Sequence, residues 1–336
     1  MTVPPVTEPP VTEPRGTIRL PARDIPVPDS VSREARGVIA NTPAQRVEYP
    51  ALDDPAAWRA MIAAHDGAIA AMMTGRAAAP VTVKNRDLAD CRVYEITPEG
   101  LDDSDDRVYL DIHGGGFIWG GGELCAVMAT GTALRMGARV WAVDYRMPPD
   151  HPFPAALDDC LAAYRALLGE RPPERIIVGG ASAGGNLAAA LILRARDEGL
   201  PLPAAVVLMT PGADLTEAGD SHQVNLGLDP LIPGSGRPAF LLYAAGRDLS
   251  DPYLSPLNGD FTRGFPPAIL TTGTRDMLLS DTVLLHRALR RAGVPAELHV
   301  TEAAGHGGFM GMAPEDQEIL REVRRFADTY WSKEQL

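Results

Sequence analysis

The sequence predicts an α/β protein with a mostly parallel central sheet and helices on both of its faces. From residue 81 onward, short apolar runs alternate with longer amphipathic runs that have helical spacing. The short runs are mostly apolar, as expected for strands that are buried on both faces. Two glycine-rich turns directly follow such runs, at residues 113–116 and 180–184. This alternation is typical of a sheet covered by helices on both sides.

Length and charge limit the classes of function. The chain has 336 residues, enough to bury a large core, and 45% of them are hydrophobic. Its formal net charge of -13 argues against nucleic-acid binding, which needs clustered Lys and Arg. The acidity also argues weakly against docking on anionic membranes, and it is compatible with a simple contribution to solubility.

Cysteines and histidines give no sign of a metal centre. The three cysteines, Cys91, Cys125 and Cys160, are far apart, so they predict neither a disulfide framework nor a zinc site. The seven histidines are scattered and form no HExxH pair. We therefore expect no metal and no cofactor. The chain start lacks the apolar segment of a signal peptide and no stretch is long enough to span a membrane, so a cytoplasmic location is expected.

The region before residue 81 divides into two parts. Residues 1–30 are rich in proline and contain PPVTE twice in tandem, which predicts a disordered arm. Residues 31–80 are interpreted as a helical N-terminal cap segment, with a helix starting near Pro55. Apolar side chains between Trp58 and Met73 could line a pocket or merely pack on the main domain. Residues 81–336 are the predicted catalytic domain, within which residues 215–265 form a weakly patterned stretch interpreted as a further cap or lid.

The elements of that domain follow one another in order. We predict strands at residues 108–112, 139–145, 175–180, 204–209, 268–273 and 297–302. Helices are predicted at residues 155–168, 186–199, 277–293 and 314–331.

Ser182 is the candidate nucleophile. It lies in Gly-Ala-Ser-Ala-Gly at residues 180–184, between a predicted strand and a predicted helix. The G-x-S-x-G motif in that context holds a serine in a sharp turn with its Oγ exposed at a helix N-terminus. A dinucleotide-binding turn is an alternative, but its middle glycine is replaced by Ala181. A tight turn with an incidental serine is a second alternative.

Three consecutive glycines follow the strand at residues 108–112, in His-Gly-Gly-Gly-Phe at residues 113–117. Such a run is costly for stability alone, but acyl transfer needs bare backbone N–H groups that point at an oxyanion. An HGGG loop is the usual partner of the G-x-S-x-G turn in esterases. We expect the oxyanion donors to be the N–H groups of Gly115, Gly116 and Ala183. His113 precedes the nucleophile and is interpreted as a structural residue of the loop.

These segments resemble the hormone-sensitive-lipase-like family of microbial carboxylesterases, which have the α/β-hydrolase fold. The resemblance rests on residues 113–117, on DYRMPPDHPFPAALDD at residues 144–159, on GGASAGGNLA at residues 179–188, and on the downstream Asp and His segments. It covers the chain from about residue 81 to the C-terminus. The resemblance implies a helical cap built partly from the N-terminal region and no cofactor. It leaves open whether the chain forms a homodimer.

The acid and the base are expected after the nucleophile, in the order Ser, Asp or Glu, His. Asp276 comes directly after the strand at 268–273, whereas Asp281 lies one turn into the next helix and Glu302 falls within a strand, so both are weaker candidates. His306 follows the last strand in a glycine-rich loop. The other downstream histidines, His286 and His299, fall within a helix and a strand and are interpreted as structural.

The chain departs from the family's pattern at three places. Ala181 stands where the family commonly has an aspartate before the nucleophile, and Met277 stands where it has a proline after the triad aspartate. An extra glycine separates His306 from Phe309. None of these changes removes a catalytic group, but they affect the pocket and hence the substrate.

The sequence thus predicts a carboxylic ester hydrolase that uses Ser182, Asp276 and His306 in an acyl-enzyme mechanism. The expected substrates are esters of short- to medium-chain acids, with lactones and aryl esters as further candidates. An amidase with the same triad is an alternative that the sequence does not separate. A non-catalytic binding protein of the same fold is another, although such proteins usually lose the serine or the histidine.

Overall fold

The computed structural model describes residues 16, 18, 22, 24–41, 47–73, 79–88 and 90–332. Eight strands form one sheet in the order β1-β2-β4-β3-β5-β6-β7-β8. β1 and β2 pair antiparallel, as do β2 and β4, and every other neighbouring pair is parallel. The strands are β1 (Val81–Asp87), β2 (Arg92–Pro98), β3 (Val108–Ile112), β4 (Arg139–Asp144), β5 (Ile176–Ala181), β6 (Ala205–Met209), β7 (Ala268–Gly273) and β8 (Ala296–Thr301).

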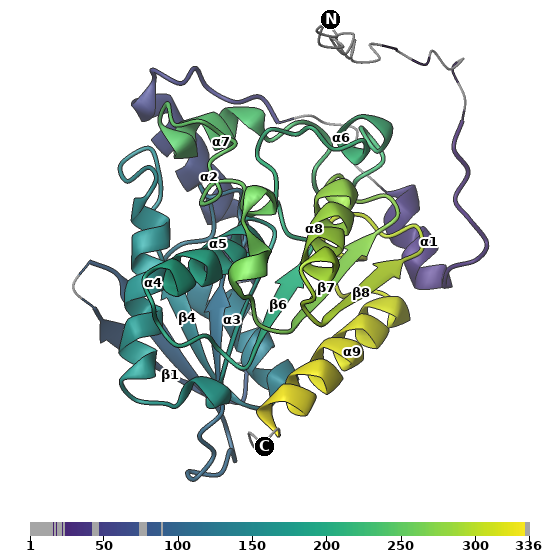
Figure 1. The fold of residues 1–336 in the computed structure, drawn as a ribbon. Helices are drawn as coiled ribbons and strands as arrows, with labels where there is room; N and C mark the ends of the chain where they lie inside the picture. Colours follow the sequence, from purple (N-terminus) through teal and green to yellow (C-terminus); the bar gives the residue numbers. More distant parts are fainter. Residues whose placement is uncertain are drawn as a thin grey trace, which may run out of the picture.

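Helices cover both faces of this sheet (Figure 1). One core cluster joins α4, α5 and α8 to the sheet, and the other joins α3 and α9 to its opposite face. The predicted α/β-hydrolase architecture is confirmed. The α-helices are α1 (Arg33–Ala40), α2 (Pro55–Met73), α3 (Glu123–Met136), α4 (Ala155–Leu168), α5 (Ala183–Asp197), α6 (Ser221–Val224), α7 (Arg237–Ala244), α8 (Leu279–Arg291) and α9 (Pro314–Trp331). Three short 3₁₀ turns complete the set, η1 (Pro173–Arg175), η2 (Pro256–Asn258) and η3 (Phe261–Arg263).

Two strands, β1 and β2, and three helices, α3, α6 and α7, of the described residues were not predicted. β1 is an edge strand whose side chains are mostly exposed, so it lacks the apolar run that marks the buried strands. α3 carries Gly131 and two threonines within a helix that buries mainly small side chains, and this composition hides its helical period.

The N-terminal region contains two separate helices, α1 and α2. Residues 47–54 are not helical, and α2 begins at Pro55, where the sequence predicts a helix start. Pro50 and Pro55 explain the break, because proline disfavours helical geometry in the residue before it. The two helices lie at opposite ends of the molecule (Figure 1). Most of the predicted arm, including both PPVTE repeats, lies outside the described residues.

Each of these helices packs on a different loop of the main domain. Ala35 and Val38 of α1 contact the loop between β8 and α9, where Phe309 is buried with them. Trp58 of α2 is fully buried against Ile118, directly after the glycine loop. The side chain of Met72 is exposed, and that of Met73 lies outside the described part.

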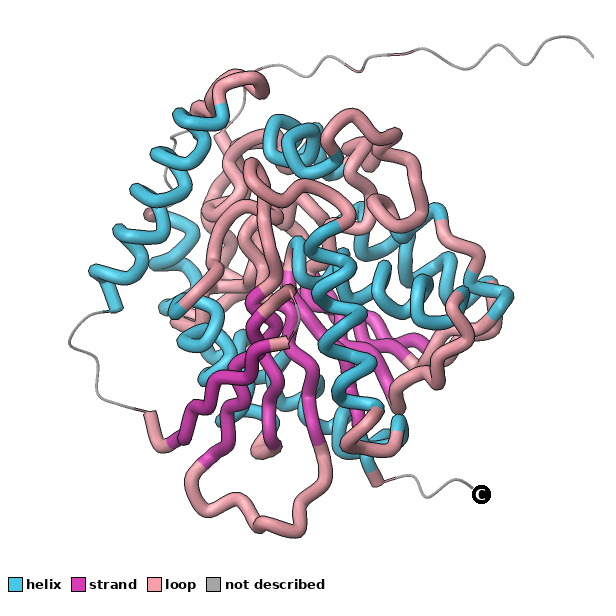
Figure 2. Tube along the Cα trace, turned by 90° about the vertical axis from the view of Figure 1, so that its left-hand side faces the viewer, coloured by secondary structure: helices cyan, strands magenta, loops and turns pink. Residues whose placement is uncertain are grey.

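Loops gather at the end of the sheet where β5, β6, β7 and β8 finish (Figure 2). These strands are parallel neighbours, so the segments that follow them leave the sheet on the same side. Among the helices of the described residues, none combines the length and the apolar composition that a membrane crossing needs. The three cysteines are free and buried.

Candidate active site

Ser182 occupies the turn between β5 and α5 in a backbone conformation that serine rarely adopts. Its φ is 57° and its ψ is -122°. The turn is held from below, because the N–H of Ser182 donates to the carbonyl of Met209 at 3.0 Å. A side chain at Gly184 would collide with the carbonyl oxygen of Ile112 in the next strand, so only glycine lets α5 start this close to the sheet. The strained turn and close approach match a nucleophile elbow.

The glycine loop lies directly against this elbow. A Cβ on Gly114 would stand 3.4 Å from the Cβ of Ser182. Gly115 has a φ of +116°, and a side chain there would collide with the carbonyl of Trp119. No acceptor among the described residues takes the backbone N–H of Gly115, Gly116 or Ala183. These three N–H groups therefore lie on the elbow or on the glycine loop that packs against it, with no acceptor among the described residues.

His113 contacts the glycine loop itself and Tyr145. Its Nδ1 lies 2.7 Å from the carbonyl oxygen of Gly114, and its ring stacks on Tyr145 with centroids 4.0 Å apart. The hydroxyl of Tyr145 donates to the His113 carbonyl at 2.9 Å. Burial lowers the pKa of His113, so the ring is held neutral.

Asp276 and His306 meet at the ends of β7 and β8. The Nδ1 of His306 lies 3.2 Å from Oδ1 of Asp276, and both side chains are buried. The Asp276 carboxylate accepts only, so Nδ1 of His306 carries the proton and Nε2 is left as an acceptor. The pair therefore has the tautomer that a general base requires.

Two threonines complete the surroundings of Asp276, and sequence reasoning did not single out either of them. The hydroxyl of Thr210 donates to Oδ2 of Asp276 and also lies 2.9 Å from Nδ1 of His306. The hydroxyl of Thr272 donates to the same Oδ2 at 2.8 Å, and the N–H of Leu278 donates to Oδ1 at 2.8 Å. The position of Thr210 directly after β6, next to the strand that carries Asp276, is the signal that could have revealed it.

The pKa shifts of the pair follow from these contacts. Burial acts to raise the pKa of Asp276, but the charge and hydrogen bond of His306, with the donors from Thr210 and Leu278, lower it below its ordinary value. Burial acts to lower the pKa of His306, but the charge and hydrogen bond of Asp276 and the charge of Asp229 raise it above 6.5. Asp276 is therefore an anion at neutral pH, and an imidazolium at His306 is stabilised.

The rejected candidates have partners elsewhere. Asp281 lies in the first turn of α8 and contacts Nε2 of His222, a histidine that sequence reasoning did not consider, at 2.9 Å. His286 contacts the carbonyl oxygen of Ala296 at 3.3 Å, from within α8. His299 lies on β8, 3.5 Å from Glu297. None of these side chains contacts the His306–Asp276 pair.

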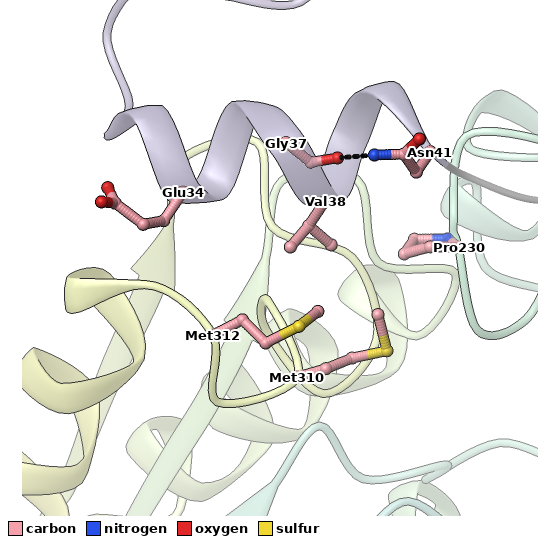
Figure 3. A pocket seen from close by; sticks show the side chains of 7 residues that line it. All are labelled: Glu34, Gly37, Val38, Asn41, Pro230, Met310 and Met312. Atoms are coloured by element: carbon pink, nitrogen blue, oxygen red, sulfur yellow. Dashed lines mark hydrogen bonds between the residues drawn. The ribbon is translucent and has the colours of Figure 1, made fainter.

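A groove of about 480 Å³ lies beside the His306 loop (Figure 3). Val38 of α1 faces Met310 and Met312 of the loop across it, and Pro230 closes one end. None of Ser182, Asp276 and His306 lines this groove. Within the described ranges, no group of three or more His, Cys, Asp or Glu side chains is arranged to hold a metal ion.

Comparison with known proteins places the chain in a family. Residues 109–310 match the family model of the alpha/beta hydrolase fold. The chain is 39% identical over 193 residues to an acetyl-hydrolase of Streptomyces hygroscopicus, a match that spans 57% of this chain and 64%, under two thirds, of that protein. It is 35% identical over 248 residues to the carboxylesterase NlhH of Mycobacterium tuberculosis, across 66% of this chain and 76% of the relative.

Solved structures agree with this placement. The crystal structure of esterase E25 aligns with a TM-score of 0.81 and 36% identity, covering 93% of this chain and 98% of that one. An esterase from the bacterial hormone-sensitive lipase family aligns with a TM-score of 0.75 and 30% identity, covering 90% and 99%. A dinucleotide-binding turn at residues 179–184 receives no support from these matches. The chain belongs to the alpha/beta hydrolase family and, within it, to the hormone-sensitive-lipase-like carboxylesterases.

Proposed function

We propose that this carboxylesterase hydrolyses esters of short- to medium-chain acids through an acyl-enzyme on Ser182, with His306 as general base and Asp276 as its orienting carboxylate. The observation that carries the proposal is the hydrogen-bonded pair of His306 and Asp276, together with a serine held in a strained elbow. The N–H of Ser182 donates to the carbonyl of Met209, and the next residue, Thr210, contacts both members of the pair. All three segments follow parallel strands of one sheet, where the catalytic loops of open α/β sheets emerge.

In the first step Nε2 of His306 takes the proton of Ser182 as its Oγ attacks the ester carbonyl. The imidazolium that forms is stabilised by the buried Asp276 anion, which stays ionised because its pKa is lowered. His306 then gives the proton to the departing alcohol. In the second half of the reaction, His306 activates a water molecule that hydrolyses the acyl-enzyme and frees Ser182.

The tetrahedral intermediates of both halves carry an oxyanion. In this proposal the N–H groups of Gly115, Gly116 and Ala183 bind it. Ala183 directly follows Ser182, the glycine loop packs against Ser182 at Gly114, and these three N–H groups donate to no acceptor of the described chain. Ala183 is the first residue of α5, so the partial positive charge of the helix N-terminus adds to the effect. Preorganised donors of this kind are usually a large part of the catalytic effect.

The cap belongs to the same proposal. Trp58 of α2 packs on Ile118 after the glycine loop and on Ala239 of α7. α2 and α7, which lies within residues 215–265, thus meet at Ile118, just after the glycine loop. We propose that they form the cover of the acyl site, which would make them the elements that set chain-length preference.

The test is a substrate series with a variant at the nucleophile. Acetate, butyrate, octanoate and dodecanoate esters of p-nitrophenol are compared in kcat/KM, together with a lactone and a matched ester and amide. We expect the highest efficiency among acetate to octanoate, in line with the acetyl-hydrolase relative. Ser182→Ala should fold and lose activity on every substrate, and a Ser182→Ala enzyme with wild-type turnover would overturn the mechanism.

A further inference from the structure

Asp229 is a buried carboxylate that none of the sequence motifs includes. It lies between α6 and α7, its side chain is fully buried, and it belongs to the segment predicted as a lid. Its Oδ1 accepts from the N–H groups of Leu231 and Ile232 at 2.9 and 3.0 Å. One carboxylate oxygen therefore fixes the local turn and leaves the other oxygen for distant partners.

The second oxygen of Asp229 joins the two loops of the candidate active site. Oδ2 accepts the backbone N–H of His306 at 2.9 Å and that of Met277 at 3.0 Å. Met277 directly follows Asp276, so one oxygen atom ties the loop after β7 to the loop after β8. These loops are 30 residues apart along the chain at the two residues that pair. A single buried anchor thus fixes both members of the His306–Asp276 pair from behind.

Asp229 also acts on His306 through its charge. The charged groups that face His306 are Asp276 and Asp229, and both raise its pKa. Burial raises the pKa of Asp229 itself, while the charge of His306 and the N–H donors of Ile232 and Met277 act in the opposite direction. Each of its oxygens accepts two N–H groups, the arrangement that a buried carboxylate needs.

We propose that Asp229 is a positioning residue for ester hydrolysis, which holds His306 and Asp276 in register and stabilises the imidazolium with a second negative charge. The inference rests on the proposed function of Ser182, Asp276 and His306. It explains why a segment remote from the motifs reaches the catalytic loops with a buried charge. Asp229 touches the backbone of those loops, so it acts through His306 and does not contact substrate.

The packing around Asp229 leaves little room for adjustment. A Cβ on Gly305 would collide with the ring of Pro230 and come within 3.3 Å of Oδ1 of Asp229. Pro230 is also the residue that closes the end of the groove beside Met310 (Figure 3). A substitution at Gly305 therefore separates the Asp229 turn from the His306 loop while every charge is kept.

The main test is Asp229→Asn in the full chain. Active sites are counted by titration with a fluorophosphonate, so that kcat refers to folded enzyme alone. We expect kcat to fall about 10- to 100-fold with KM within about twofold, since a charge-assisted hydrogen bond to the loop is lost. The acid limb of the kcat/KM profile should move to lower pH, because removing a negative charge lowers the pKa of His306.

Asp281→Asn is the matched control. Asp281 is also buried, contacts a histidine, and accepts the N–H of Asp214 at 3.0 Å, but it has no contact with His306. This variant should lose stability and keep both the wild-type kcat per titrated site and the wild-type acid limb. A purely structural role for Asp229 would make Asp229→Asn behave in the same way, and that result would overturn the inference.

Gly305→Ala serves if Asp229→Asn does not fold. We expect a lowered kcat per titrated site with KM close to wild type, and an unchanged kcat would count against the positioning role. Ser182→Ala distinguishes a failure of the proposed function from a failure of the proposed role of Asp229. Activity in Ser182→Ala would defeat the proposed function, whereas an inactive Ser182→Ala beside an unaltered Asp229→Asn would defeat only the role of Asp229.

Discussion

The described residues include two buried histidine–aspartate pairs, and their aspartates belong to one short segment. His306 pairs with Asp276 at the ends of β7 and β8, while His222 of α6 pairs with Asp281 of α8. Asp276 also accepts from two threonine hydroxyls and a backbone N–H, whereas Asp281 has one further donor, the N–H of Asp214. The two pairs thus consist of the same residue types, but their aspartates accept different numbers of hydrogen bonds.

The difference appears in the pKa of each carboxylate. Burial acts on both, but the donors around Asp276 outweigh it and lower its pKa. At Asp281 burial prevails over the charge and hydrogen bond of His222 and raises the pKa. His222 also has a raised pKa, because the hydrogen bond and charge of Asp281 exceed the effect of burial. The first pair keeps a fixed anion, whereas the aspartate of the second pair retains its proton to higher pH than an ordinary carboxyl group.

The histidines should show the largest contrast in activity. We expect His306→Ala to lower kcat on p-nitrophenyl butyrate by at least about 10⁴-fold, since this variant lacks the general base of the proposed mechanism. His222→Ala should keep kcat per active site within about threefold and lose thermal stability instead. Comparable kcat losses in the two variants, measured per titrated site, would show that His306 is no more important for turnover than His222.

The aspartates should differ nearly as much. Asp276→Asn should lower kcat by about 10⁴-fold, because an amide favours the wrong tautomer of His306. Asp281→Asn should cost turnover little, since Asp281 contacts only His222 and the backbone of Asp214. Steady-state measurement of kcat for both variants shows which aspartate matters for turnover. The reverse ranking would move the triad role to Asp281.

The sequence was sufficient to predict the features that depend on residues close together along the chain. Residues 108–112, 155–168, 268–273 and 314–331 form the predicted elements, because long apolar or amphipathic runs fix them locally. The chain order of Ser182, Asp276 and His306 also places each one directly after a strand or its turn. Their catalytic roles stay a proposal.

The features that the sequence did not predict depend on contacts between segments that are distant along the chain. Thr210 meets Asp276 across two strands, and Asp229 reaches His306 from the far side of a long loop. His222 finds Asp281 only after α6 packs on α8. No spacing rule along the chain encodes such encounters, because the register of the sheet and the path of residues 215–265 create them.

A smaller effect is expected for the Thr210 hydroxyl, one of the two that donate to Asp276. Thr210→Val removes that donor and keeps the branched shape, so we expect kcat to fall about tenfold. Thr282→Val is the control, because Thr282 is equally buried and donates to the carbonyl of Leu278 at 3.0 Å within α8. Equal kcat values for the two variants, each measured per active site, would show that the Thr210 hydroxyl does not support Asp276.

The smallest effect concerns stability at the second pair. The pKa of His222 is raised in the folded state, so the stability it contributes is fully present below about pH 6.5 and is lost as pH rises through the raised value. His222→Gln should therefore lower the free energy of unfolding by about 1–3 kcal/mol near pH 6, and by less at pH 9. Urea unfolding of both proteins across this range gives the difference directly. A difference that grows with pH would mean that His222 is held neutral in the folded protein, and would contradict a raised pKa for His222.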